Sequence, residues 1–251
     1  MKIKQLCIVA TALTLGAGAT TAMAQESETP ILSMTRIYLE PVSWGAFGAA
    51  MSDYIDCYAE NAGEQSWSAW RDVGNDVVWI VSSMDGWAAM DEEPGEASRE
   101  CRPILEENMP AVVKKTKTDY ARYLSDWSDS AEDFNVVRLH QFMVEEGDEF
   151  REVIGKMTSM VKEAEDAPVG VWYGMIGVDA GEVNYFQVSQ YENFAAMDAD
   201  RPSYNSAMVE ALGEEGAEEM WDEMMDSLAD EGYKTVLLAR QPAWSYSTDE
   251  E

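Results

Sequence analysis

Short stretches of the chain alternate apolar and polar residues, which is the pattern of β-strands. In residues 34–42 (MTRIYLEPV), the aliphatic side chains of Ile37 and Leu39 alternate with polar or charged ones. Later stretches show a similar apolar–polar pattern or short apolar runs bounded by turn residues. On this basis further strands are predicted at residues 66–71, 77–83, 118–124, 135–143, 169–176, 183–190 and 233–240.

Between these strands, apolar residues recur at the three- to four-residue spacing of amphipathic helices. Ser43 is placed to cap a helix that ends near Gly63, and Asp148 is placed to cap another. Longer helical regions are predicted from residue 85 to about residue 115, and again up to Gly232. The elements therefore follow the order β-α-β-β-α-β, and this order occurs twice.

One stretch of sequence also occurs twice. Residues 74–91 read GNDVVWIVSSMDGWAAMD and residues 181–198 read GEVNYFQVSQYENFAAMD, and the two align without a gap at an offset of 107 residues. Farther along each copy, the Trp-Ser pair at residues 127–128 matches the pair at residues 244–245 at an offset of 117. The sequence therefore predicts two copies of one unit, with the extra residues in the second helical region.

The order of elements in each unit is that of a ferredoxin-like sheet with two helices on one face. In residues 77–81 (VVWIV) both faces of the strand are apolar, although an open sheet face should carry polar residues. The sheet of the other unit is the economical cover. We therefore expect an α+β fold in which two tandem ferredoxin-like repeats, at residues 34–130 and 131–246, place their sheets face to face or share one α/β barrel.

The amino terminus has the features of a secretory signal peptide. Lys2 and Lys4 precede an apolar run at residues 6–19, and the small residues required for cleavage end at Ala24. We expect residues 1–24 to be removed and the protein to be periplasmic or secreted. A linker at residues 25–33 and an acidic tail at residues 247–251 would flank the two units. Because each unit covers the other, we expect a monomer with internal pseudo-twofold symmetry.

Two cysteines, Cys57 and Cys101, remain after the predicted cleavage, and both fall on predicted helices of the first unit. An even number of cysteines in an exported protein favours a disulfide, with two free buried thiols as the alternative. No cysteine or histidine is spaced as a pair of zinc ligands, so no metal site is predicted.

The chain is strongly acidic, with 17 basic and 48 acidic residues and a formal net charge of −31. This charge argues against nucleic acid and anionic membrane surfaces as partners, and a membrane span is not predicted in the exported chain. We interpret the acidity as a solvated surface. A small basic cluster, Lys114, Lys115 and Lys117, is interpreted as a device at the carboxyl end of a helix, with a binding patch as the alternative.

The duplicated topology resembles the dimeric α/β-barrel superfamily, which includes antibiotic-biosynthesis-type monooxygenases and NIPSNAP-like proteins. Residues 188–204 (VSQYENFAAMDADRPSY) are similar to the strand, aromatic, acidic and small-residue pattern of that superfamily. Many monooxygenase members and their haem-degrading relatives carry a histidine where this chain has Met197 and Asp198, or Met90 and Asp91 in the first copy. The resemblance therefore does not extend to haem ligation at that position, and no cofactor is predicted.

The two first strands supply the candidate site. If the helices cover the face that bears the aliphatic residues, the opposite side chains of both strands point into the space between the sheets. These side chains are Arg36, Tyr38, Glu40, Arg138, His140 and Phe142. Charged groups seldom enter an interior unless they are paired or contact a ligand. The set is therefore either an Arg–Glu ion pair with one satisfied histidine, or the lining of a cavity for a small aromatic or anionic ligand.

His140 is the only histidine, so any imidazole general base or metal ligand must be this residue. The motifs of the common hydrolases, metalloproteases and nucleotide-binding proteins are absent. Two hypotheses remain. The first is an exported protein that binds a small hydrophobic or aromatic ligand between its two sheets, and the second is a cofactor-independent monooxygenase or isomerase with His140 as base. The absence of the superfamily's histidine favours the first.

Overall fold

In the part of the chain that the structure describes, eight strands and four long helices follow one another in the order β-α-β-β-α-β, twice over. The first half contains β1 (Ile31–Leu39), α1 (Trp44–Glu60), β2 (Ser68–Asp72), β3 (Val77–Met84), α2 (Glu96–Asn108) and β4 (Val113–Tyr123). The second half contains β5 (Val136–Val144), α3 (Gly147–Glu163), β6 (Val171–Ile176), β7 (Tyr185–Tyr191), α4 (Tyr204–Asp226) and β8 (Leu228–Arg240). The predicted element order is therefore correct.

This computed structural model describes residues 30–129, 134–164, 170–179, 181–199 and 203–248. The predicted signal peptide, most of the predicted linker and the end of the predicted acidic tail lie outside these residues. None of the described helices is long and apolar enough to cross a membrane.

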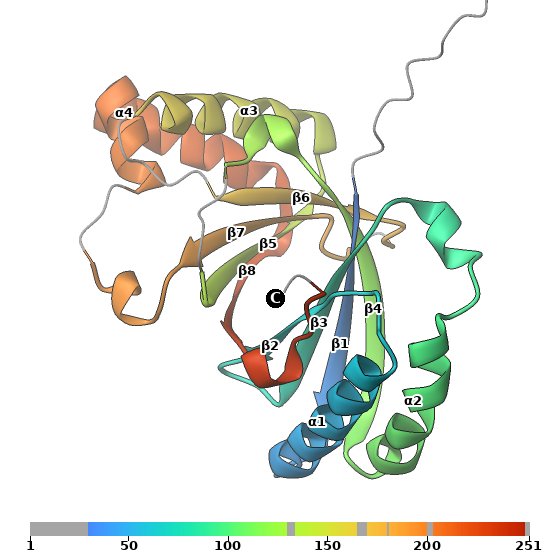
Figure 1. Ribbon diagram of the computed structural model, residues 1–251. Helices are drawn as coiled ribbons and strands as arrows, with labels where there is room; N and C mark the ends of the chain where they lie inside the picture. The colour runs from blue at the N-terminus through green and yellow to red at the C-terminus, as the bar shows by residue number, and fades with distance from the viewer. Residues whose placement is uncertain (1–29, 130–133, 165–169, 180, 200–202, 249–251) are drawn as a thin grey trace, which may run out of the picture.

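The strands form one closed antiparallel barrel in the order β1-β3-β2-β8-β5-β7-β6-β4. Within each half the order is that of a ferredoxin-like sheet, and the halves join edge to edge through β2 with β8 and β4 with β6. The α+β class and the shared barrel are thus confirmed. Figure 1 shows α1 and α2 against one side of the barrel and α3 and α4 against another.

The barrel explains why residues 77–81 are apolar on both faces. Val78 lies outside the barrel beneath α1, where it packs against Phe47. Its neighbour Trp79 points inward, in a cluster that also contains Met34 and Phe186. One face of β3 is therefore covered by helices and the other by the opposite wall of the barrel.

The chain that follows β8 packs on the first half. Trp244 stacks on Trp44 of α1 with ring centroids 6.0 Å apart. Its ring lies so close to Gly48 that a Cβ atom added there would be 3.2 Å away. The Oγ of Ser245 accepts a hydrogen bond of 2.9 Å from the backbone N–H of Ala69 in β2.

The chain that follows β4 makes the corresponding contacts with the second half. Trp127 packs edge-on against Trp172 of β6, with ring centroids 5.8 Å apart, and lies 3.8 Å from a Cβ added at Gly155 of α3. The Oγ of Ser128 accepts a hydrogen bond of 2.8 Å from the backbone N–H of Trp172. We call the two Trp-Ser pairs, at residues 127–128 and 244–245, the clasps. Each clasp ties the last strand of one half to the first helix and second strand of the other.

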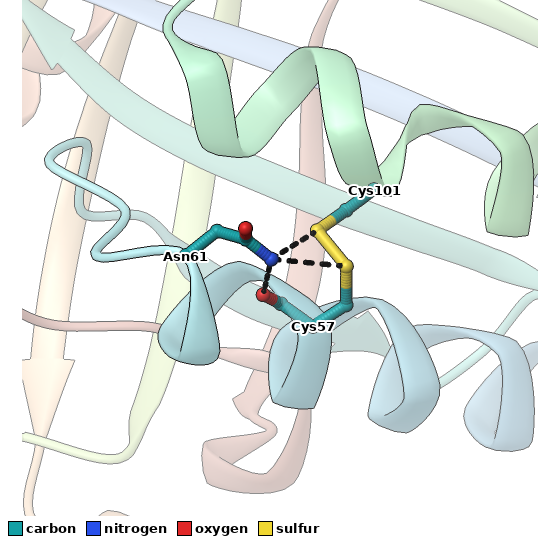
Figure 2. The surroundings of a disulfide bond; sticks show 3 residues. All are labelled: Cys57, Asn61 and Cys101. Carbon is teal, nitrogen blue, oxygen red and sulfur yellow. Dashed lines mark hydrogen bonds between the residues drawn. A yellow bond between two sulfur atoms is a disulfide. The ribbon is translucent and has the colours of Figure 1, made fainter.

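A disulfide between Cys57 and Cys101 joins α1 to α2, as predicted. Figure 2 shows the side-chain nitrogen of Asn61 beside both sulfur atoms, at 3.7 and 3.8 Å, while it donates to the Cys57 carbonyl at 2.9 Å. The cysteines are 44 residues apart in sequence. In the chain-entropy model a loop of this length gives a stabilisation of about 4 kcal/mol.

The start of β4 differs from the prediction. Residues 113–117 continue the strand instead of ending a helix, because Val113 pairs with Leu39 and Lys115 with Tyr38 along the whole of β1. Long-range pairing thus outweighs the helix propensity of the lysines. Lys114 and Lys115 lie on a strand, so their interpretation as a helix-terminal device was wrong.

The end of α4 and two caps also differ from the prediction. Gly232 lies inside β8 and not at the end of a helix, because the pairing of β8 with β5 continues past an irregularity to Leu228. Ser43 occupies the N-cap position of α1 but makes no side-chain capping bond. Asp148 lies in the first turn of α3, whose N-cap is Glu146.

The clasps predict different responses at two equivalent glycines. Gly155→Ala should raise the free energy of unfolding by about 0.5–1 kcal/mol, because alanine favours a helix interior and the Trp127 ring leaves room. Gly48→Ala should raise the free energy of unfolding by less than this, or lower it, because the Trp244 ring must move aside. Urea unfolding measures both.

The control is Gly48→Ala made in a Trp244→Ala background, where the ring is gone and the gain should return to that of Gly155→Ala. Equal effects of both substitutions in the unaltered protein would contradict the close packing of Trp244 on α1.

Candidate functional site

The structure divides the six predicted site residues between two places. Arg36 and Tyr38 line cavities inside the barrel, as predicted, and Glu40 is exposed at the end of β1. Three residues of β5 face the other way: Arg138, His140 and Phe142 line a cavity outside the barrel, beneath the helices. The expectation that all six share one cavity was wrong.

Strand register explains the division. Arg36 pairs with Trp79, and Gln141 pairs with Phe186, which lies 107 residues after Trp79. Gln141 and not His140 is therefore the counterpart of Arg36. Neighbouring residues of a strand point to opposite faces. From the sequence, Arg138, His140 and Phe142 were predicted to lie on the same face as Arg36, whereas Gln141 is the residue of β5 that shares that face. All three side chains were therefore assigned to the wrong face of the sheet.

We call the cavity outside the barrel the helix-side cavity. Its volume is about 660 Å³, and it lies between the outer face of the second half's sheet and helices α3 and α4. Strands β5, β7 and β8 supply a polar floor that includes Arg138, His140, Ser189 and Tyr233. The helices supply an apolar roof that includes Ile154, Met157, Trp221, Met224 and Met225.

The polarity of this cavity changes along β5. Arg138 pairs with Ser189 of β7 at one end, and both line the cavity. Four residues farther along β5, Phe142 stacks on Trp172 with ring centroids 5.3 Å apart. Four residues of strand span about 14 Å. The cavity therefore has a cationic, hydroxyl-bearing end and an aromatic end.

His140 lies between these two ends and is neutral at ordinary pH. Its Nδ1 lies 2.6 Å from the Tyr233 hydroxyl, and its Nε2 lies 3.3 Å from Ser189 Oγ. Burial, and then the nearby positive charge of Arg138, lower the pKa of His140 from 6.5 to about 4. The imidazole can therefore hydrogen-bond a ligand, but it is a weak base in the empty site.

Among the described residues that line the cavity, Arg138 carries the positive charge, and its side chain is exposed. Among the part of the chain that the structure describes, no acidic side chain forms an ion pair with it. An exposed arginine without a carboxylate partner contrasts with the large excess of acidic residues in this chain. A ligand that carries an anionic oxygen would supply the missing partner.

Several lining residues were not found from the sequence. Trp172 Nε1 donates to the Tyr204 hydroxyl at 3.3 Å, and burial raises the pKa of Tyr204 to about 12. The methionines of the roof were interpreted simply as core. Their spacing on the helices is the same for a packed core and for a cavity wall, so no sequence signal separates the two.

Inside the barrel, Arg36 forms an ion pair with Asp119 of β4, and Lys117 bridges Asp119 and Glu182. An Arg–Glu ion pair was predicted from the sequence as the alternative to a ligand site. Arg36 does form an ion pair, but its acidic partner is Asp119 and not a glutamate. Across the described residues, no group of three or more His, Cys, Asp or Glu side chains is arranged to hold a metal ion.

The single histidine gives a direct test of the site's electrostatics, because only one imidazole C2–H signal is expected by proton NMR. We expect it to titrate near pH 4. Between pH 6.5 and 4 the unfolded chain binds a proton at His140 that the folded protein does not. This residue therefore lowers stability progressively as the pH falls through that window.

Arg138→Gln should raise the pKa of His140 only in part, because burial is the larger cause of its depression. A titration near pH 6.5 in the folded protein would show that the ring is solvated and would contradict the site geometry.

No protein-family model and no curated protein sequence matches this chain. Solved structures with a similar fold include a candidate monooxygenase from Fusobacterium nucleatum subsp. nucleatum, with a TM-score of 0.53 and 14% identity over 84% of this chain and 92% of that chain. A candidate monooxygenase from Lactobacillus acidophilus has a TM-score of 0.52 and 14% identity, over 85% and 94% of the two chains. An anthrone oxidase-like protein has a TM-score of 0.55 and 11% identity, over 89% and 95%. The chain therefore has the fold of the dimeric α/β-barrel superfamily.

Proposed function

We propose that this protein binds a small aromatic molecule with an anionic oxygen in the helix-side cavity. The proposal rests on the guanidinium of Arg138, which forms no ion pair with any described residue, at one end of a cavity whose other end is formed by Phe142 and Trp172. This site replaces the position between the sheets that the sequence predicted.

The size and lining of the cavity fit such a ligand. A volume of about 660 Å³ lies within the range of small-molecule sites, roughly 300–1,000 Å³. Methionine side chains such as Met157 and Met224 adapt to flat, apolar ligands of different outline. The aromatic body would lie against this roof, while its oxygen would meet Arg138 and the hydroxyl of Ser189.

The proposal predicts selective binding of 2-naphthoate, a planar aromatic carboxylate, over its neutral analogue 2-naphthamide. Arg138→Gln should weaken the binding of 2-naphthoate about tenfold, the usual value of one charge-assisted hydrogen bond. It should leave the weak binding of 2-naphthamide unchanged. Isothermal titration calorimetry measures both ligands.

The matched control is Arg122→Gln, which removes the same charge from an exposed arginine of β4. This variant should bind 2-naphthoate as the unaltered protein does. Equal affinity for the two ligands, or equal loss in both variants, would remove Arg138 from the site and leave only an apolar cavity.

A second candidate function is cofactor-independent oxygenation. It is favoured by the position of His140 on the cavity floor and by the fold shared with structures described as a monooxygenase and as anthrone oxidase-like. In this function His140 would accept a proton from a bound phenol or enol, Arg138 would hold the resulting anion, and the anion would transfer electrons to O₂. A bound anion would also raise the pKa of His140 and make it a better base.

Oxygen uptake separates the two functions. With a phenolic substrate, His140→Gln should abolish uptake in an enzyme, whereas in a carrier it should only weaken binding and no uptake should occur with either protein.

We also propose that the chain is exported, that it arose by duplication of one unit, and that it is a monomer because the two halves replace the two subunits of a dimer. The recurrence of the clasp contacts in both halves supports duplication. Intact mass and light scattering of protein isolated from its own host should give one chain that lacks residues 1–24. An uncleaved amino terminus would exclude this signal peptide, and a stable dimer would exclude the proposed monomer.

A further inference from the structure

One end of the barrel carries a set of polar residues that the proposed function does not use. Neighbouring strands are antiparallel, and β5 is four steps from β1 around the ring, so the two strands run in the same direction. Their carboxyl ends, the β2–β3 turn and the β6–β7 turn therefore lie at the same end. We call this end the barrel mouth.

Two cavities open into the barrel mouth, with volumes of about 210 and 450 Å³. Arg36, Trp79 and Gln141 line both cavities and so separate them. The smaller cavity has an apolar wall that includes Met34, Leu139, Met143, Met175, Val183 and Phe186. The barrel mouth thus combines polar groups with an apolar floor.

The carboxylates that line these cavities already have hydrogen-bond partners. Asp119 accepts from Arg36, and Lys117 binds both Asp119 and Glu182. Asp72 accepts from the backbone N–H of Gly74 and from the side chain of Asn75. Asp76 accepts from Trp44 Nε1 at 2.7 Å. These four carboxylates are therefore engaged.

The groups left over are hydrogen-bond donors. Arg36 Nε and Trp79 Nε1 are buried, and neither has a hydrogen-bond partner within the described parts of the chain. Trp79 is only 6% exposed. Buried donors without an acceptor are rare and unfavourable in folded proteins. Such a surplus of donors is complementary to a ligand rich in oxygen acceptors.

The corresponding residues of the second half show that the fold does not require these groups. The counterparts of Arg36, Trp79 and Asp119, from strand register, are Gln141, Phe186 and Val236. The same positions in the same fold are thus filled there without a charge or an indole N–H. The combination of Arg36, Trp79 and Asp119 therefore occurs in the first half and not at the matching positions of the second.

Lysines add positive charge at the barrel mouth, where they offset the carboxylates that line the two cavities. The basic cluster of Lys114, Lys115 and Lys117 lies at the start of β4, at this same end of the barrel. Lys114 lines the larger cavity and Lys117 the smaller. These lysines bring the charge of the residues that line the two cavities close to balance, so a small anion would meet less repulsion here than over the rest of a chain whose net charge is −31.

We propose that the barrel mouth is a second binding site, for a small carboxylate with a short apolar body, and that Arg36 Nε and Trp79 Nε1 hold its carboxylate. Both donor atoms are covered in the present conformation, with the Arg36 guanidinium 5.3 Å from the centre of the Trp79 ring. The ligand reaches them when the Arg36 side chain, which is 22% exposed, rotates off the indole. The apolar body then lies against Leu139 and Phe186.

The test uses sodium butyrate as the probe, with butyramide as its neutral counterpart and inorganic phosphate as an anion without an apolar body. The readout is the indole N–H signal of Trp79 in a ¹H–¹⁵N NMR spectrum, identified by its disappearance in Trp79→Phe. Butyrate at millimolar concentration should shift this signal in a saturable way. Butyramide and phosphate at the same concentration should shift it at least about tenfold less, because one charge-assisted hydrogen bond changes affinity by about that factor.

Trp79→Phe should fold, because the matching position of the second half is already a phenylalanine, Phe186. Calorimetry should show that this variant binds butyrate about tenfold more weakly than the unaltered protein. The control is Arg122→Gln, which removes a positive charge from an exposed residue of β4 outside both sites and should leave the response of the Trp79 signal to butyrate unchanged. That signal reports on the barrel mouth alone. Failure of 2-naphthoate binding would therefore not affect this result.

Three outcomes would overturn the proposal. No shift of the Trp79 signal with butyrate would mean that these donors stay unpaired or bind only water. An equal response to phosphate would show general attraction of anions without a shaped site. Unchanged affinity in Trp79→Phe would place the butyrate elsewhere.

Discussion

Each half lends its last strand to the sheet of the other half, since β8 pairs with β2 and β4 pairs with β6, and the rest of the structure depends on these two pairings. Neither half closes a barrel by itself, because β2 and β6 would be unpaired edges without β8 and β4. Each exchanged strand then ends in a clasp, whose serine accepts a backbone hydrogen bond and whose tryptophan covers a helix of the other half. Edge pairing and aromatic packing thus act at the same two seams and close the barrel.

The two helix layers that this barrel supports have taken different roles. Around the first half, the disulfide joins α1 to α2, and Tyr58, Trp67 and Tyr246 pack together beside it. Around the second half, the described residues of α3 and α4 contain no such link, and the space between helices and sheet remains partly open. The disulfide-linked half therefore has close helix packing, and the other half contains the cavity to which we assign ligand binding.

The chemistry follows the same asymmetry. Register makes Ser33 and Thr35 of β1 the counterparts of Arg138 and His140 of β5. Two small hydroxyl side chains in one half therefore correspond to a cation and an imidazole in the other. Inside the barrel the asymmetry is reversed, since the first half carries the charged residues Arg36 and Asp119. The cation and the imidazole of β5 thus lie outside the barrel, whereas the Arg36–Asp119 ion pair of the first half lies inside it.

The sequence was sufficient for the element order, the shared barrel and the disulfide, because these depend on local periodicity, on the repeat and on cysteine number. The site was harder to predict. The alternation along β5 was read correctly, but Val137 and Leu139 face the barrel and Phe142 faces the helices, so both faces of that strand are largely apolar. When both faces are apolar, periodicity cannot say which one is inside, and only the pairing of Gln141 with Phe186 decides it.

Lys114 and Lys115 show the same limit, because their place on a strand is decided by pairing with β1 and not by their own propensity. The roof of the helix-side cavity could not be predicted either, because Met157 and Met224 would have the same spacing along their helices in a solid core. Features set by contacts between distant parts of the chain were therefore those that local patterns missed.

Native mass spectrometry of the protein purified from its own host tests the central claim most directly, because a ligand retained from the cell needs no prior guess at its identity. The account predicts a complex of one protein chain with one small aromatic acid, and loss of that added mass in protein carrying Arg138→Gln. Two results would contradict it. One is protein with only the mass of the bare chain, measured under conditions that preserve its complex with added 2-naphthoate. The other is a bound species with no acidic group.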